Sequence, residues 1–378
     1  MAAAEPKKQP RKKGKRSKKS GKNVFFGLTS RVLMSIAAGL MGISYLSFII
    51  NPAKFWLISL FGLAFLPLLA VNFSLLVWAA VRKSKAFIIP LLAILPCVFF
   101  LGRYIQVSAD SESQSDAANL KVLSYNLGRF ALSDRKSGVS DRRQCADSAF
   151  AYLKRQDADI MCLQEFYVNN DDFRAFKTYL RRHFPGYHAE YYMFTGRNGA
   201  FGNVTLSRVP VSGKGVLKFD ESTNLAIYTD HRVGERRFRV YNCHFESYNI
   251  SYTRLVKALF HADGDAFSDT GLKMKKSISR RPKQVDQVFS NIEDCPYEAF
   301  VCGDFNDNPM SYTYYRMTRD RKDAFVSAGS GFGSTYSHLW PLLRIDYVLV
   351  PDRFDARDCE VHRVRFSDHY PVVAEVMF

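Results

Sequence analysis

The chain has 378 residues, with 53 lysines and arginines against 36 acidic residues, for a formal net charge of +17. Sixteen of the basic residues and one acid, Glu5, precede residue 110, so the remaining 37 basic and 35 acidic residues nearly balance. The C-terminal two thirds therefore lack a strong field for gathering polyanions. The seven cysteines show no CxxC or other zinc spacing, which argues against a zinc site and leaves disulfides open.

Residues 1–23 are rich in Lys and Arg and almost without apolar side chains, so we expect a disordered tail. Three uncharged apolar runs follow, and each approaches the length needed to cross a bilayer. The runs are 32–50, 55–81 and 86–102. We expect residues 24–103 to form a membrane anchor of three transmembrane helices, the alternative being three buried helices of a soluble bundle.

The charges that flank these runs predict an orientation. The tail and the loop 82–85 are basic, whereas the turn 51–54 carries one lysine. By the positive-inside rule the N-terminus is cytoplasmic, and three crossings leave the C-terminal part outside. We therefore expect a multi-pass protein of the cell membrane with an extracytoplasmic domain, joined to the anchor by a polar linker at 104–118.

Residues 119–378 alternate short apolar β runs with amphipathic helical stretches, which predicts an α/β domain. Strands are expected at 120–125, 159–163, 187–193, 201–207, 224–232, 236–243, 298–302, 345–350, 358–365 and 371–377. Helices are expected at 141–156, at 171–183 and at both ends of 251–291, with a mobile polar excursion at 262–276. Two sheets packed face to face and covered by helices would accommodate this order.

One apolar strand, 299–302, stops at Gly303 and then presents Asp304 and Asn306. Period-2 geometry puts these two side chains on the same side of the chain. Oxygen-bearing side chains aimed at one point suit a hard cation and a phosphate. A polar turn after a core strand would give the same pattern, so the motif depends on partners elsewhere.

Such partners stand at the ends of the other predicted strands. They are Asn126, Glu165, Asn203, His244, Asp346, Asp368 and His369. The ordered series N, E, GN, H, GDFN, RIDY and SDH resembles the endonuclease/exonuclease/phosphatase family over residues 119–378. The resemblance implies a deoxyribonuclease-like, four-layer α/β/β/α sandwich.

The resemblance also implies a metal site. It makes Glu165 the main ligand, with Asn126 and Asp368 contributing to the same site. Oxygen ligands that leave room for water favour Mg²⁺, and Mn²⁺ could substitute. Some family members carry an acid two residues after the first Asn, but this chain has Gly128 there. That departure argues against a second metal site.

By the same resemblance, His369 is the expected general base, and Asp346 orients it. Asp304 is expected to orient or activate the attacking water, and His244 to bind the scissile phosphate or protonate the leaving group. Further phosphate contacts are expected from three side chains: Asn203, Asn306 and Arg129.

Three functions remain open. The first is a membrane-anchored, divalent-metal-dependent phosphodiesterase of the nuclease type. The second is a sphingomyelinase-like or inositol-phosphatase-like phosphohydrolase that acts on lipid or small-molecule headgroups, which membrane tethering would favour. The third is a catalytically inactive binding module on a membrane anchor. The expected partners are a phosphodiester substrate and, through the N-terminal helices, a lipid bilayer; no protein partner is predicted.

Overall fold

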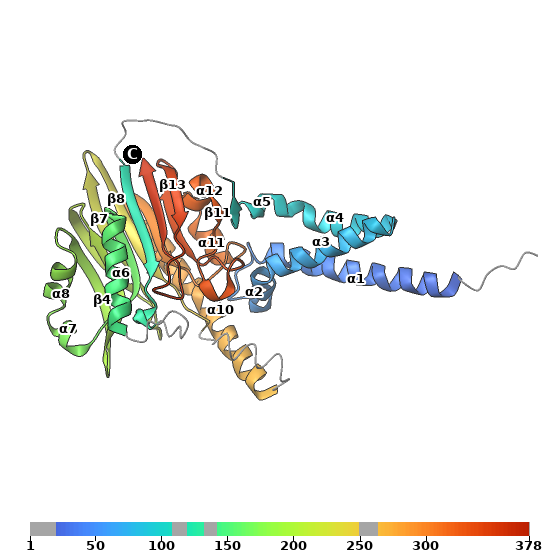
Figure 1. The fold of residues 1–378 in the computed structure, drawn as a ribbon, viewed down its shortest axis with the longest axis horizontal. Helices are drawn as coiled ribbons and strands as arrows, with labels where there is room; N and C mark the ends of the chain where they lie inside the picture. Colours follow the sequence, from blue (N-terminus) through green and yellow to red (C-terminus); the bar gives the residue numbers. More distant parts are fainter. Residues whose placement is uncertain (1–19, 108–118, 132–141, 249–263, 378) are drawn as a thin grey trace, which may run out of the picture.

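The computed structural model describes residues 20–107, 119–131, 142–248 and 264–377. Two six-stranded mixed sheets lie face to face at one end of the molecule, and a group of helices extends from them (Figure 1). The β2 sheet has the order β13-β14-β2-β3-β5-β4. Its strands are β2 (Asn119–Asn126), β3 (Ile160–Val168), β4 (His188–Gly196), β5 (Gly199–Ser207), β13 (Asp355–Val361) and β14 (Val372–Met377).

The β9 sheet has the order β10-β12-β9-β8-β7-β6. Its strands are β6 (Val211–Lys218), β7 (Leu225–Val233), β8 (Arg236–His244), β9 (Glu298–Asp304), β10 (Arg321–Asp323) and β12 (Asp346–Pro351). A small separate sheet pairs β1 (Ile105–Gln106) with β11 (Gly331–Phe332).

Alternating side chains explain the layers. On β2, Val122 faces the other sheet, whereas Leu123 and Tyr125 face helices on the outside. The outer face of the β2 sheet is covered by α6 (Arg142–Gln156), α7 (Asn170–Arg174) and α8 (Phe176–His183). The outer face of the β9 sheet is covered by α10 (Gly264–Glu293) and α11 (Tyr312–Met317), and α12 (Ala324–Ala328) packs at the interface between the sheets. This arrangement confirms the four-layer α/β/β/α sandwich.

Strand register brings the predicted polar positions to one edge. The ends of β2 and β3 lie side by side, because these strands are parallel and Asn126 pairs with Gln164. In the β9 sheet, Asp304 is the register partner of His244 on one side and of Asp346 on the other.

The helical unit, residues 20–104, differs from the three spans expected. Its elements are α1 (Ser20–Leu46), α2 (Trp56–Leu63), α3 (Phe65–Val81), η1 (Lys85–Phe87), α4 (Ile88–Ile94), η2 (Leu95–Cys97) and α5 (Val98–Leu101). Among the described residues, the segment Gly27–Leu46 is long and apolar enough to cross a membrane. The pair α2 and α3 passes the same test only if its 60° bend lies within one span, and Lys85–Leu101 is shorter.

Prolines account for the broken runs. Pro67 has no N–H to donate to the carbonyl of Leu63, and the chain bends at Ala64. Pro96 likewise interrupts the third run, which is divided among α4, η2 and α5. The prediction of three transmembrane helices is therefore corrected: in the described residues one helix, or two if the bent pair forms one span, is long and apolar enough to cross a membrane.

Three other expectations also need correction. The helix expected at 171–183 is divided into α7 and α8, and the edge strand β6 was not predicted. The excursion expected at 262–276 is helical from Gly264 onward, and residues 262–263 lie outside the described part. The disordered tail was expected over residues 1–23. Residues 1–19 lie outside the described part of the chain, and α1 begins at Ser20. None of the seven cysteines, all of which lie in the described residues, forms a disulfide.

Candidate active site

Asp304 lies at the centre of the site, where both sheets end. Its Oδ2 accepts hydrogen bonds from Nδ2 of Asn126 (2.8 Å) and from Nδ2 of Asn306 (3.1 Å). Its Oδ1 accepts from the backbone N–H of Asn306 (2.8 Å). Asp304 is buried, and so are both asparagines. Donors from the β2 sheet and from the loop after β9 therefore bind the same carboxylate.

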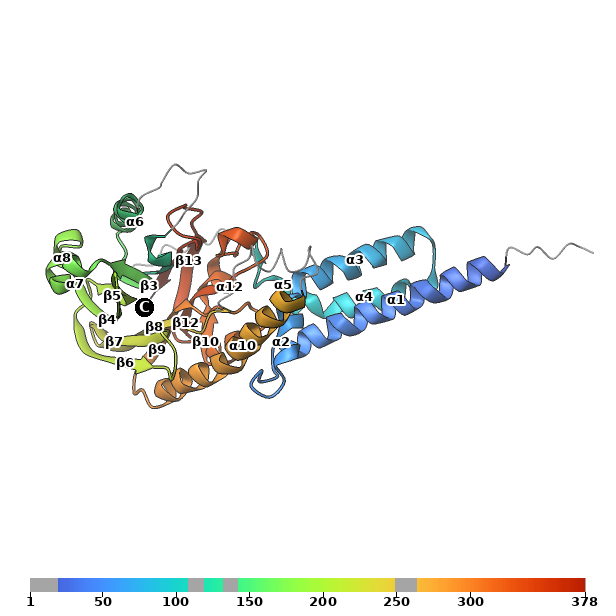
Figure 2. The ribbon, with the colours of Figure 1, turned by 90° about the horizontal axis from the view of Figure 1, so that it is seen from below.

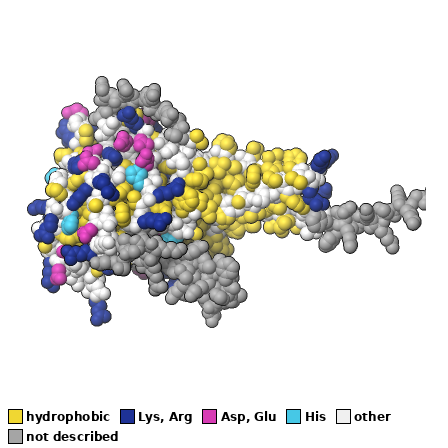
Figure 3. All heavy atoms as spheres, in the orientation of Figure 1, with side chains coloured by type: hydrophobic (Ala, Val, Ile, Leu, Met, Phe, Trp, Pro, Cys, Tyr) yellow, Lys and Arg dark blue, Asp and Glu magenta, His cyan; other side chains and the backbone are white. Residues whose placement is uncertain are grey.

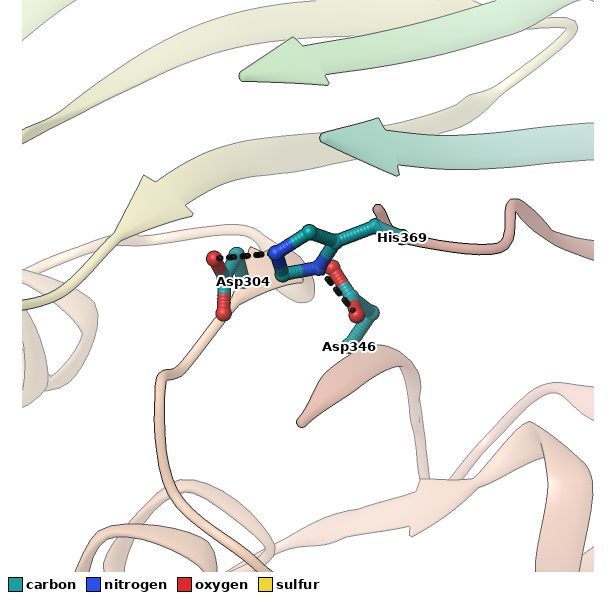
Figure 4. A group of neighbouring side chains, drawn as sticks. All are labelled: Asp304, Asp346 and His369. Atoms are coloured by element: carbon teal, nitrogen blue, oxygen red, sulfur yellow. Dashed lines mark hydrogen bonds and ion pairs between the residues drawn. The ribbon is translucent and has the colours of Figure 1, made fainter. Parts of the chain in front are cut away.

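His369 lies between two carboxylates (Figure 4). Its Nδ1 is 2.9 Å from Oδ2 of Asp346, and its Nε2 is 3.8 Å from Oδ2 of Asp304. Asp346 is held by its backbone N–H, which donates to Oγ1 of Thr335 (3.0 Å), and His369 N donates to Oγ of Ser367 (3.1 Å). The predicted orientation of His369 by Asp346 therefore has the required geometry.

Two groups of this cluster have pKa values above their usual values. Burial, with the nearby charge of Asp346, raises the pKa of Asp304 to about 6. Burial alone would lower the pKa of His369, but the charges of Asp346 and Asp304 raise it well above its usual value. These shifts favour a protonated His369. Its predicted role as the general base stays a prediction.

His244 brings a second imidazole to the site. Its Nε2 is 3.6 Å from Oδ2 of Asp304 and 3.8 Å from Oε1 of Glu165. This nitrogen is buried without a hydrogen-bond partner in the described part of the chain. A buried polar atom without a partner is costly, so it marks a place where a ligand oxygen would be stabilised.

Three residues of the site have backbone conformations that are uncommon outside glycine. The φ angles of Arg129, Glu165 and Asn306 are 54°, 49° and 51°. Residues held at positive φ store about 1–3 kcal/mol each and cluster at functional sites. At Glu165 this conformation coincides with a bulge in β3, where the register with β5 shifts between Leu163 and Phe166. The bulge re-aims the carboxylate, which no simple alternation would predict.

A cavity of about 650 Å³ opens beside His244 and Glu165. Arg129 lies on its wall, with its guanidinium 3.8 Å above the ring of Phe201 and its Nε 3.0 Å from Oε2 of Glu165. The opposite wall comes from α10. It includes Lys273, Lys276, Ser277 and Arg280. The cavity therefore joins His244 and Glu165 to basic side chains, and it is also lined by Glu246 and by Glu221, which pairs with Arg280.

The α10 residues were missed by sequence reasoning. The basic stretch 262–283 was interpreted as an excursion that could face a membrane or gate the substrate, and none of its residues was assigned to the site. The hydroxyl of Thr335 was also missed, since a lone threonine before a turn carries no sequence signal. Only its contacts with the amides of Ile345 and Asp346 identify it.

The residues present fit a divalent cation. Ligand atoms of Asp304, Asp346 and His369 lie within 4.8 Å of one another and could hold a metal ion. Hydrogen bonds already join several of these atoms, whereas Oδ1 of Asp346 has no partner in the described residues. The predicted ligand Asn126 ends β2, and the predicted ligand Glu165 lies at the bulge of the neighbouring strand β3. Their role stays a prediction.

Two predicted residues have other partners. Asn203 donates from Nδ2 to the carbonyls of Asn242 (3.0 Å) and Leu225 (3.3 Å), so its amide joins the two sheets. Asp368 lies against Gly128: a Cβ at position 128 would come within 2.8 Å of Oδ1 of Asp368. That contact, and a φ of 53° at Gly128, explain why this position has no acid. A phosphate contact for Asn203 and a metal contact for Asp368 stay predictions.

Comparisons with known proteins show the family of the chain. Residues 123–369 match the Endonuclease/Exonuclease/phosphatase family, and residues 24–104 match a domain of unknown function, DUF8431. No curated protein matched the chain.

Solved structures resemble the sandwich domain at low sequence identity. An endonuclease/exonuclease/phosphatase from Bacteroides vulgatus is 17% identical, with a TM-score of 0.50, over 69% of this chain and 99% of that chain. Humanized D. rerio TDP2 is 14% identical, with a TM-score of 0.49, over 69% and 99%. The human Nocturnin catalytic domain, solved with a bound sulfate anion, is 17% identical, with a TM-score of 0.49, over 69% and 93%. At these identities the likeness concerns the fold alone.

Proposed function

Because the chain belongs to the endonuclease/exonuclease/phosphatase family, whose members hydrolyse phosphoester bonds, we propose that it is a membrane-anchored, divalent-metal-dependent phosphodiesterase of the nuclease type. One observation carries the proposal: three strand ends and the segment after β13 place His244 and His369 beside Asp304, and His369 also beside Asp346. A chain that had kept only the fold would have no reason to bury this many titratable groups together.

The residues divide the chemistry among themselves. Asp304, ionised above pH 6, accepts the proton of the attacking water as its oxygen bonds to phosphorus. His369 stays protonated and, held by Asp346, stabilises the charge that grows on the phosphoryl oxygens. The bond from phosphorus to the leaving oxygen then breaks, and His244 donates a proton to that oxygen.

The cation supplies one further contribution. When bound, it neutralises charge on the phosphodiester. The carboxylate of Glu165 and the amide oxygen of Asn126 would hold it, and hard oxygen ligands favour Mg²⁺ over softer metals. Asp368 would assist from the neighbouring segment.

The surface of the helical unit supports the membrane anchor (Figure 3). Large apolar side chains are exposed along it, including Ile36, Phe73, Leu95 and Phe99. A continuous apolar surface of this kind marks a membrane or protein contact. The basic residues Arg82, Lys83 and Lys85 gather at the end far from the sandwich domain, which suits a cytoplasmic side and an extracytoplasmic domain. A reporter fused to the C-terminus tests this topology, and a cytoplasmic signal would contradict it.

A second candidate function is a phosphohydrolase of lipid headgroups. It is favoured by direct contact between the two parts: Oγ of Ser47 donates to the Met310 carbonyl, and α10, which lines the cavity, packs against α2 (Figure 2). The cavity would then open near the bilayer surface. The near-neutral charge of the sandwich domain also weakens the case for a nucleic-acid groove, which is normally basic.

One experiment separates the candidates. The full-length protein with Mg²⁺ is incubated with supercoiled plasmid DNA and, separately, with sphingomyelin vesicles, beside Glu165→Ala and the matched control Glu235→Ala, whose side chain is 96% exposed. We expect nicked plasmid and intact lipid with the wild type and the control, and neither product with Glu165→Ala. Lipid cleavage alone supports the second function. Equal nicking by Glu165→Ala and the wild type would contradict the proposed site, and no product from either substrate would favour the inactive binding module.

A further inference from the structure

The loop 307–310 directly follows Asn306 and contacts the helical unit. Three hydrogen bonds join them: Ser47 Oγ to the Met310 carbonyl (2.6 Å), Arg103 Nη1 to the Pro309 carbonyl (3.1 Å) and Asn308 Nδ2 to the Gly62 carbonyl (2.9 Å). Each of the residues 308, 309 and 310 is therefore held by a different segment of the helical unit.

The contact is closely packed. Met310 is fully buried in a cluster with Met41, Phe65 and Tyr104, all from the helical unit. Gly62 leaves no space for a side chain, since a Cβ there would lie 2.0 Å from Oγ of Ser47 and 2.7 Å from the Met310 carbonyl. Such packing resists small displacements, so the loop has one position relative to the helices.

The other end of the loop is fixed from within the sandwich domain. Asp307 pairs through Oδ2 with Nη1 of Arg281 (3.0 Å), and its carbonyl accepts from the hydroxyl of Tyr347 (2.9 Å). Tyr347 directly follows Asp346. The four-residue loop is therefore held between the helical unit and the two strands that carry Asp304 and Asp346.

A second connection reaches the strand of Asp346. Arg344, two residues earlier, donates from Nη1 to the carbonyl of Arg103 (3.0 Å) and pairs with both carboxylate oxygens of Asp323. Arg344 is almost completely buried. Arg103 thus contacts the segments next to both catalytic strands. Its side chain donates to the Pro309 carbonyl after β9, and its carbonyl accepts from Arg344 before β12.

We propose that the helical unit is a positioning component of the active site, in addition to any anchoring role. Ser47 and Arg103 fix the loop 307–310, and the loop fixes Asn306, whose two donors hold the Asp304 carboxylate. The inference rests on the proposed hydrolase function for its kinetic part. Misplacement of a reacting group by about 1 Å can cost up to about 10²-fold in rate, so these remote contacts are expected to act on kcat.

The test compares two serines on the same helix end in the full-length, detergent-solubilised protein. Ser47→Ala removes a hydroxyl that lies within hydrogen-bond distance of the loop carbonyl of Met310 (2.6 Å) and of the Ser44 carbonyl (2.7 Å). The control Ser44→Ala removes a buried bond that stays within the helix, to the carbonyl of Met41 (2.7 Å). The substrate is bis(p-nitrophenyl) phosphate with Mg²⁺. We expect kcat to fall about three- to thirtyfold in Ser47→Ala with KM unchanged, and to stay within about twofold in Ser44→Ala. Arg103→Lys should keep more activity than Arg103→Met, since Lys retains a donor.

Hydrogen exchange of the peptide covering residues 303–312 provides a readout that needs no turnover. Exchange should be about two- to tenfold faster in Ser47→Ala than in Ser44→Ala. Equal exchange in the two variants, or equal kcat, would overturn the inference. If the wild type has no turnover of the probe, the proposed function fails, and the exchange measurement alone decides whether the helical unit positions the loop.

Discussion

The β9 sheet and the β2 sheet contribute to the site in different ways. The β9 sheet supplies His244, Asp304 and Asp346, which are almost completely buried. The β2 sheet supplies Glu165, whose side chain keeps a quarter of its surface exposed and faces the cavity. The buried half suits proton transfer, where a dry and rigid setting strengthens electrostatic effects. The more open half suits entry of a cation and a substrate.

The largest expected effect comes from the buried half. Asp304→Asn keeps the shape of the side chain but removes the proton acceptor, so kcat should fall about 10²- to 10⁴-fold. Steady-state hydrolysis of bis(p-nitrophenyl) phosphate measures it, and circular dichroism checks the fold. The control is Asp355→Asn, an exposed acid on β13. Near wild-type turnover in Asp304→Asn would remove this residue from the mechanism and erase the distinction between the halves.

Glu165→Gln tests the open half. If the carboxylate holds the cation, the Mg²⁺ concentration for half-maximal activity should rise about 10- to 100-fold, with partial recovery of rate at high Mg²⁺. A Mg²⁺ titration of activity, with Glu235→Gln as the control, measures the change. A lower rate with an unchanged Mg²⁺ requirement would assign Glu165 to the chemistry instead, and the two halves would then share one role.

The pH dependence should report the buried half. Because Asp304 must be ionised to accept a proton, kcat/KM should fall about tenfold per pH unit below about 6. A profile at constant ionic strength measures this acid limb. An acid limb that lies below pH 5 would indicate that Asp304 is not the acceptor.

Arg129→Lys is expected to have the smallest effect. The charge remains, but the planar stack on Phe201 and the directed bond to Glu165 are lost. KM should rise about three- to tenfold while kcat changes little. Initial rates over a range of substrate concentrations separate the two constants. A change confined to kcat would place Arg129 with the proton-transfer groups rather than at the cavity wall.

Much of the fold followed from local pattern. Period-2 apolar runs identified most strands of both sheets, and the polar residues at their ends were assigned to one site before any register was known. The register then placed Asp304 beside His244 and Asp346. Local pattern could not predict which charges and hydrogen-bond partners surround each ionisable side chain. The proton on His369 depends on two carboxylates that come from distant parts of the chain.

The failures share a physical cause. Whether an apolar run forms one helix or several depends on which carbonyl a proline leaves unbonded, and the hydropathy of 55–81 does not register the bend at Ala64. The contact of Asn203 with the carbonyl of Asn242 in the other sheet was also not predicted, because sequence alone does not show which polar side chains meet between the sheets. The α10 wall was missed because charge in sequence does not reveal which side of a helix meets a cavity.

Gly303 has a consequence for how this site can vary. Its φ is 136°, and a Cβ would lie 1.9 Å from the carbonyl of Cys243 on the adjacent strand. Even a methyl group would wedge β8 and β9 apart at their last hydrogen-bonded residues, and the separation of 3.6 Å between His244 and Asp304 would widen with them. Alanine at position 303 would therefore disable the enzyme without altering any group that handles a proton, and a sequence survey limited to acids and histidines would overlook the damage.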